Sequence, residues 1–226
     1  RSRRNDAANG VESEPIRMAA LLIQQSLLQN SSIVLVSGLG DSMVPANLLN
    51  CLSECLANRG ERVLLVDAVD HHQSGGPAKQ PLSDLVENTA SPNAQSTTDT
   101  AGTKLKTKSS RGLCDIFSAA PPDVADMIQH TQNPCVDVIT SGDAMFPAEA
   151  MASERLTQLL MDCQRSYSLI FVAGPPVSCR ADFQMLAARA DAIVLTGDNR
   201  SVKQPSSPAA IRDLIELQAP VIGMMA

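Results

Sequence analysis

The feature that most restricts the fold is the segment "SSIVLVSGLGDSMVPANLLNCLSECLANRGERVLLVDAVDHH", Ser31 to His72. A β-branched apolar run is followed by a glycine-containing turn, a stretch with helical spacing of apolar residues, and a second apolar run ending in Asp67. Short continuous apolar runs are typical of buried parallel strands. The segment therefore predicts a βαβ unit with parallel strands at Ile33–Ser37 and Val63–Asp67 and a right-handed crossover.

The same alternation continues along the chain. Further strands are predicted at "VDVITSG", "SLIFVAG", "AIVLTG" and "APVIGMMA", and helices at "PAEAMASERLTQLLMDCQRS", "ADFQMLAARA" and "SPAAIRDLIELQ". This order predicts an α/β fold with a mostly parallel central sheet of at least five strands and helices on both faces. Ile33–Ser37 and Val63–Asp67 should be adjacent or nearly so, with Ile170–Ala173 in the same sheet. Ligand sites in such sheets lie beyond the carboxyl ends of the strands.

Two segments fall outside this alternation. Residues 1–30 are predicted to form a tail and an amphipathic helix at Glu14–Gln29. Residues 73–110 are rich in Ser, Thr, Pro, Gly, Asn and Lys, and predict a mobile insertion, most clearly at Ser91–Ser109, with a short helix near "PLSDLVEN". We expect residues 1–226 to form a single domain.

Composition argues against several classes of function. A net charge of −6 gives no reason to expect nucleic-acid binding. The six cysteines form no C-x-x-C and the three histidines have no zinc-site spacing, so no metal site is predicted. Most cysteines lie in or beside apolar segments, as buried reduced thiols do, which favours a cytoplasmic protein. No apolar run approaches the ~18 residues of a membrane span, and no signal peptide is visible.

Three short motifs follow one another in a family-specific order: "RGLCDIF", "PAEAMASERLTQLL" and "YSLIFVAGPPVS". The second keeps Pro147, Glu149, Ser153 and Leu156 of its pattern. Together they resemble the cytoplasmic domain of the bacterial tyrosine kinases (BY-kinases) of capsule and exopolysaccharide synthesis. Those kinases are relatives of the deviant-Walker ATPases that position division sites and partition plasmids. The resemblance covers the chain from about residue 14 to residue 225, except the insertion, and implies a three-layer P-loop-NTPase-like domain.

The phosphate loop of this family reads S-x-x-x-G-E-G-K-S/T. Counting back without gaps from "RVLLVDAVD" places Ser42, Met43, Val44, Pro45 and Ala46 on the G-E-G-K-S/T positions. Such loops need glycines so that backbone N–H groups converge on phosphate, a lysine to neutralise it, and a hydroxyl for magnesium. Ser42 and Val44 carry a Cβ, Pro45 has neither charge nor N–H, and Ala46 has no hydroxyl. The resemblance therefore implies a degenerate Walker A loop.

Acidic residues of the family are also replaced in this sequence. The second acidic strand of the family carries two carboxylates. Asp67 keeps the first of them, whereas Val69 occupies the position of the second. Asp70 is one residue further on and would point elsewhere on an extended strand. Ala173 occupies the position of the Walker B aspartate, and Gly174 that of the threonine. Phosphoryl transfer depends on positioning and charge compensation, so we expect no catalytic residue, no metal and no cofactor. Asp67 is the remaining acidic candidate.

The resemblance also bears on assembly and location. The family's terminal tyrosine cluster is missing, and the single tyrosine, Tyr167, is expected to pack before a core strand. The family's ring-forming E-x-x-R-x-x-R helix is kept in part, which makes Glu14 and Arg17 candidate contacts in a homo-oligomer. The resemblance implies a cytoplasmic domain, held at the inner face of the membrane by a region upstream of Arg1. Its implied partners are proteins of a polysaccharide export or co-polymerase system, including a membrane-anchored N-terminal part or a sister subunit.

The leading hypothesis is a catalytically inactive pseudokinase that serves as a regulatory or interaction module in exopolysaccharide or capsule biosynthesis. One alternative is a tyrosine kinase or ATPase that binds ATP and magnesium weakly through a nonstandard loop, with Asp41, Asp67 and Asp70 supplying carboxylates. Another is a deviant-Walker-like partner-binding protein outside polysaccharide export. A titration with ATP, ADP and magnesium separates the second hypothesis from the others.

Overall fold

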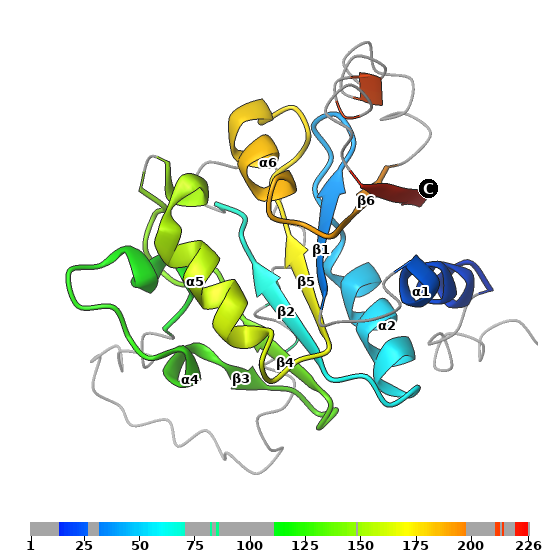
Figure 1. Ribbon diagram of the computed structural model, residues 1–226, viewed down its shortest axis with the longest axis horizontal. Coiled ribbons are helices and arrows are strands. Elements are labelled where there is room, and N and C mark those ends of the chain that lie inside the picture. Colours follow the sequence, from blue (N-terminus) through cyan, green and yellow to red (C-terminus); the bar gives the residue numbers. More distant parts are fainter. Residues whose placement is uncertain are drawn as a thin grey trace, which may run out of the picture.

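The central feature of the computed structural model is one seven-stranded sheet of order β3-β4-β2-β5-β1-β6-β7 (Figure 1). The structure describes residues 14–26, 32–70, 82, 85, 111–147, 149–197, 211–212, 214 and 220–225. The strands are β1 (Ser32–Gly38), β2 (Val63–Asp67), β3 (Gln129–His130), β4 (Val136–Ile139), β5 (Leu169–Ala173), β6 (Ala192–Thr196) and β7 (Val221–Met225). All neighbouring pairs are parallel except β3 with β4. The predicted mostly parallel sheet is confirmed.

The middle of the sheet is formed by β2, β5 and β1. β5 lies between the other two and pairs in parallel with both, with Val36 opposite Ala173 and Asp67 opposite Ala173. The expectation that β1 and β2 lie near each other in one sheet with β5 is therefore confirmed. The short antiparallel edge strand β3 was not predicted, because two residues are too few to show an alternating pattern.

Helices cover both faces of the sheet (Figure 1). On one face lie α1 (Glu14–Ser26) and α2 (Ala46–Ala57), whose apolar side chains share a core with β1, β2 and β5. The other face is covered by η1 (Leu113–Phe117), α4 (Val124–Met127), η2 (Ala150–Ala152), α5 (Glu154–Cys163) and α6 (Arg180–Ala187). The arrangement has three layers, as the sequence predicted.

The apolar runs of the strands have a simple cause. Successive side chains of a strand point to opposite faces, so Val34 and Val36 pack against α1 and α2, whereas Ile33 and Leu35 belong to the core under α5 and α6. Because both faces are covered, every residue of β1 is buried. The same holds for β2 and β5.

The predicted continuous helix over "PAEAMASERLTQLLMDCQRS" is wrong in its first part. Glu149 adopts a left-handed conformation with φ 63°, a single 3₁₀ turn follows, and α5 begins only at Glu154. The hydroxyl of Ser153 caps α5 by accepting a hydrogen bond from the N–H of Arg155 at 3.2 Å. Serine favours such caps over helix interiors, which explains the break.

Several sequence predictions fall on residues outside the described ranges. These include the tail, residues 27–29 of the first helix, most of the helix predicted at 207–218, and the whole of Ser91–Ser109. Of residues 73–110 the structure describes Leu82 and Leu85. In the described part of the chain, none of the helices has the length and hydropathy needed to cross a membrane.

Candidate functional site

A cleft of about 560 Å³ lies beyond the carboxyl ends of β2 and β5, beside the loop that follows β1. Its walls come from that loop, from the residues after β2, from the segment before η2, and from the Pro175–Asp182 region that leads into α6. This is the edge of a parallel sheet at which ligand sites are expected. The cleft is therefore the candidate functional site.

The charged side chains of this cleft are all acidic. Asp41, Asp70, Glu149 and Asp182 line it, and no Lys, Arg or His is among its described lining residues. Like charges gathered at a concave surface give it a negative potential. A bound phosphate chain would meet repulsion instead of compensation here. The electrostatics of the cleft thus oppose the chemistry of a phosphate site.

Four of the five loop positions that the sequence aligned with a phosphate loop do not line the cleft. Val44 packs against the core under α1 and α2, Pro45 is the N-cap of α2 with φ −69°, and Ala46 is buried as the first residue of that helix. Ser42 is half-buried. None of the four lines the cleft, where the loop contributes Asp41 and Met43.

The acidic candidates are distributed differently from the expectation. Asp67 ends β2, is 2% exposed, and accepts a hydrogen bond from the N–H of Val69 at 3.2 Å, but it does not line the cleft. Asp70 does line it. The expectation that Asp70 points elsewhere applied to a strand extended through Asp70, whereas β2 ends at Asp67. Ala173, opposite Asp67, is buried in the core.

Among the cleft residues that the sequence did not single out is Cys179. Cys179 is exposed and lies in the cleft between β5 and α6. Partial burial, followed by the negative charges of Asp182 and Asp41, raises the pKa of its thiol above the ordinary value. A raised pKa keeps the thiol protonated at neutral pH, so Cys179 lacks the thiolate that a nucleophile requires.

Tyr167 lies at the opposite, amino end of the strands. It is 5% exposed, and its hydroxyl donates a hydrogen bond of 2.7 Å to Asp137 Oδ2. Burial, then the hydrogen bond to Asp137 and its charge, raise the pKa of Tyr167, against a smaller lowering by Arg62. The expected packing role is confirmed. The sequence did not predict that Asp137 also contacts His130, with 2.6 Å between Oδ1 and Nδ1.

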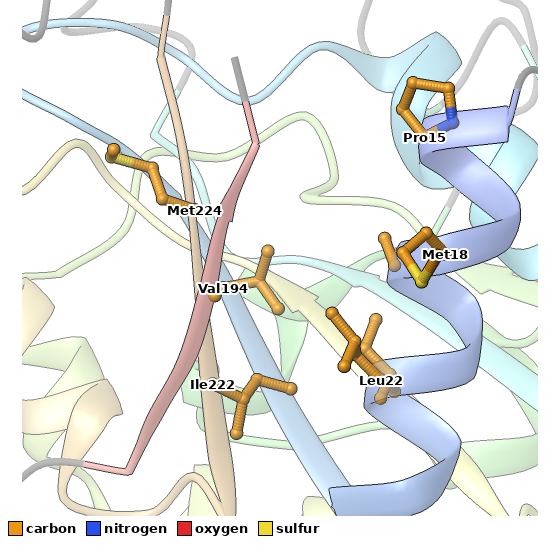
Figure 2. A pocket seen from close by; sticks show the side chains of 9 residues that line it. Pro15, Met18, Leu22, Val194, Ile222 and Met224 are labelled. Carbon is orange, nitrogen blue, oxygen red and sulfur yellow. The ribbon is translucent and has the colours of Figure 1, made fainter.

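The candidate oligomer contacts Glu14 and Arg17 are both exposed on α1. Their role in assembly stays a prediction. Beside them, an apolar groove of about 280 Å³ lies between α1 and β7, where Ile222 of β7 and Val194 of β6 point toward Leu22 of α1 (Figure 2). Met18 and Met224 also line the groove. Both methionines are about half exposed, at 52% and 50%. Within the described ranges, no three His, Cys, Asp or Glu side chains are grouped so as to hold a metal ion.

Comparison with known proteins supports a relation to kinases. No model of a known protein family matches the sequence. A protein described as tyrosine-protein kinase EpsB, from Ralstonia solanacearum, is 28% identical over 176 residues, which cover 74% of this chain. The chain spans 18% of the length of that relative, and likewise 18% of EpsB from Ralstonia nicotianae.

The kinase domain of the Escherichia coli tyrosine kinase ETK superposes with a TM-score of 0.66 at 17% identity, covering 98% of this chain and 76% of that one. The resemblance to the bacterial tyrosine kinases is confirmed. The cell-division protein MinD of Aquifex aeolicus has a TM-score of 0.55 at 14% identity, covering 86% of this chain and 68% of its own. The kinase-like domain thus has the fold that bacterial tyrosine kinases share with MinD. At these identities the structural similarity establishes the fold alone.

Proposed function

We propose that this kinase-like domain transfers no phosphate and serves as a regulatory or interaction module in bacterial exopolysaccharide or capsule biosynthesis. It retains the sheet and helix layers of the bacterial tyrosine kinases. Phosphate chemistry rests on a few loop residues that contribute little to such a core, so it can be lost while the fold persists.

The observation that carries the proposal is the charge of the cleft. Four carboxylates and no described basic side chain line the place where a phosphate chain would have to bind. The loop beside it has Pro45 and Ala46 where the family has lysine and a hydroxyl. Without a basic side chain among the described lining residues, the cleft offers a nucleotide little to offset the desolvation of its phosphates.

The link to polysaccharide synthesis comes from the relatives. EpsB and ETK are tyrosine kinases by description, and the resemblance is to kinases of capsule and exopolysaccharide systems. We propose protein partners from such a system, among them a membrane-anchored part or a sister subunit. In a homo-oligomer, Glu14 and Arg17 on α1 would contact a neighbouring copy, since both are exposed.

One observation favours a second candidate function, weak binding of magnesium and ATP through a nonstandard loop. Two of the three carboxylates considered for that role, Asp41 and Asp70, line the cleft together. Carboxylate oxygens are suitable ligands for Mg²⁺. The third, Asp67, does not line the cleft and is hydrogen-bonded to Val69 N–H. The two candidates differ in whether nucleotide stabilises the protein.

The test is thermal unfolding and calorimetry of the chain with ATP or ADP, each with and without magnesium. A ligand at about 100 times its dissociation constant stabilises by about 2.7 kcal/mol. We expect flat unfolding curves at millimolar nucleotide, no hydrolysis and no autophosphorylation. Saturable micromolar binding of Mg-ATP to the unmodified chain would contradict the proposal and favour the second candidate.

A further inference from the structure

The loop after β1 turns back on its own first residue. Gly40 has φ 63°, and the N–H of Ser42 donates to the carbonyl oxygen of Leu39 at 3.3 Å. The turn brings the carbonyl oxygen of Ser42 against Gly38, so closely that a Cβ at position 38 would collide with it. Only glycine fits position 38 in this conformation. Backbone atoms of the loop itself therefore fill its interior.

A second segment holds this loop in place. After β5, the N–H of Val177 donates to the carbonyl oxygen of Gly38 at 2.9 Å, and the N–H of Ser178 donates to that of Gly40 at 3.1 Å. The buried hydroxyl of Ser37 donates to the carbonyl oxygen of Pro175 at 2.5 Å. Three hydrogen bonds thus connect residues 37–40 to residues 175–178.

This geometry is the reverse of a phosphate cradle. A cradle presents successive N–H groups to the anion around an open centre. Here the Ser42 carbonyl oxygen, which carries partial negative charge, faces Gly38. The N–H groups of Leu39 and Ser42 are already bonded, to the carbonyl oxygens of Thr196 and Leu39. An anion could sit inside the 38–42 turn only after the turn had opened.

We propose that residues 38–42 form a self-closed loop, in which the Ser42 carbonyl oxygen fills the turn and hydrogen bonds to residues 175–178 hold the loop shut. The inference deepens the proposed function and rests on it for the alignment of this loop with a phosphate loop. The closed loop opposes phosphate binding in addition to the absence of the lysine and hydroxyl side chains. Restoring the lysine, the hydroxyl and one glycine is then insufficient to create a site.

The first test is amide hydrogen exchange of the unmodified chain, with magnesium pyrophosphate as the probe. The amides of Ser42, Val177 and Ser178 should exchange slowly, and pyrophosphate should leave their rates unchanged. Exchange at the rate of an unstructured peptide, or slowing by pyrophosphate, would overturn the self-closed loop. This measurement needs no variant, so it does not depend on whether a substituted chain folds.

The second test uses the triple variant Val44→Gly, Pro45→Lys, Ala46→Ser. We expect no thermal stabilisation of it by Mg-ATP. If the triple variant binds Mg-ATP while the unmodified chain does not, the proposed function stands and the self-closed loop is wrong. If the unmodified chain itself binds, the proposed function fails first, so the two failures are distinguishable.

The third test releases the loop. Ser37→Ala removes the hydrogen bond to Pro175 and should speed exchange of the Val177 and Ser178 amides roughly fivefold, the effect of losing one ordinary hydrogen bond. Ser53→Ala is the matched control, because Ser53 is equally buried but donates to Leu49 within α2 at 2.8 Å. Equal rates at these amides in Ser37→Ala and in the control would contradict the proposal.

Discussion

The two ends of the central sheet have different polar chemistry. At the amino end, the buried carboxylate of Asp137 accepts a hydrogen bond from Tyr167 and contacts His130, and the guanidinium of Arg62 lies 5.2 Å from the Tyr167 ring centroid. Each oxygen of Asp137 thus has a partner from another element. At the carboxyl end, the charged side chains that line the cleft are four carboxylates, and none of the described lining residues is basic.

The buried polar groups at the amino end stabilise this domain, whereas a kinase would use the side chains at the carboxyl end. Interlinked buried polar groups are costly to break, because any partner left behind is buried and unsatisfied. The exposed carboxylates of the cleft, Asp41, Glu149 and Asp182, can change at little cost, because water solvates them. The amino end is therefore under structural constraint, whereas exposed side chains at the carboxyl end can change without loss of fold.

The largest effect should come from Asp137→Ala. The change leaves the buried Tyr167 hydroxyl without its acceptor, so the free energy of unfolding should fall by about 3 kcal/mol. Urea denaturation measures it. Asp41→Ala at the exposed rim of the cleft is the control and should change stability by less than about 0.5 kcal/mol. Equal losses from the two substitutions would remove the distinction between the two ends.

Tyr167→Phe should cost about 1 kcal/mol at neutral pH, because it removes one buried hydrogen bond but keeps the ring. The substitution should also change how the free energy of unfolding depends on pH in the alkaline range. The folded-state pKa of Tyr167 is raised, so its contribution is complete below the unfolded value of about 10 and is lost as pH rises above it.

Stability measured from pH 8 upward should therefore fall less steeply in Tyr167→Phe than in the unmodified chain. Burial also raises the pKa of Cys163 to about 12, which adds alkaline loss of the same sign. Cys163 is present in both proteins, so the difference between their curves reports Tyr167. Parallel curves would show that the hydroxyl does not titrate differently on folding.

His130→Gln should have a smaller effect, roughly 0.5 kcal/mol, because the side chain of His130 is 84% exposed and its contact with Asp137 is screened by water. Denaturation at neutral pH checks it. The double variant with Asp137→Ala sharpens the comparison, since His130 should then contribute almost nothing. If His130→Gln alone lowered the free energy of unfolding as much as Asp137→Ala alone, the expected order of these two effects would be wrong.

Pro45→Lys should have the smallest effect, with no measurable ATP hydrolysis. The added lysine has neither the neighbouring glycines nor the magnesium ligands that phosphoryl transfer needs. Hydrolysis is followed by phosphate release, with the unmodified chain as the baseline. Activity from this single change would show that the carboxyl end retains a working phosphate site.

The fold was predictable to a large extent, and the site much less so. β-branched runs at 33–37 and 63–67 predicted adjacent or nearly adjacent parallel strands, because burial on both faces demands continuous apolar sequence. The break at Ser153 was missed, since periodicity alone does not distinguish a helix interior from a cap. The pairing of Asp137 with Tyr167 joins residues thirty positions apart, which no local pattern reveals.

The sequence by itself determined the layers of this protein and the residue types at positions 44–46, because strand identity and residue chemistry are local properties. Only the tertiary structure decided that Asp70 joins the cleft while Asp67 does not line it, and that Ser42 closes on Gly38. Those outcomes depend on where a strand ends and how a loop turns. Both follow from the balance of backbone hydrogen bonds between segments distant in the chain, such as Gly38 with Val177.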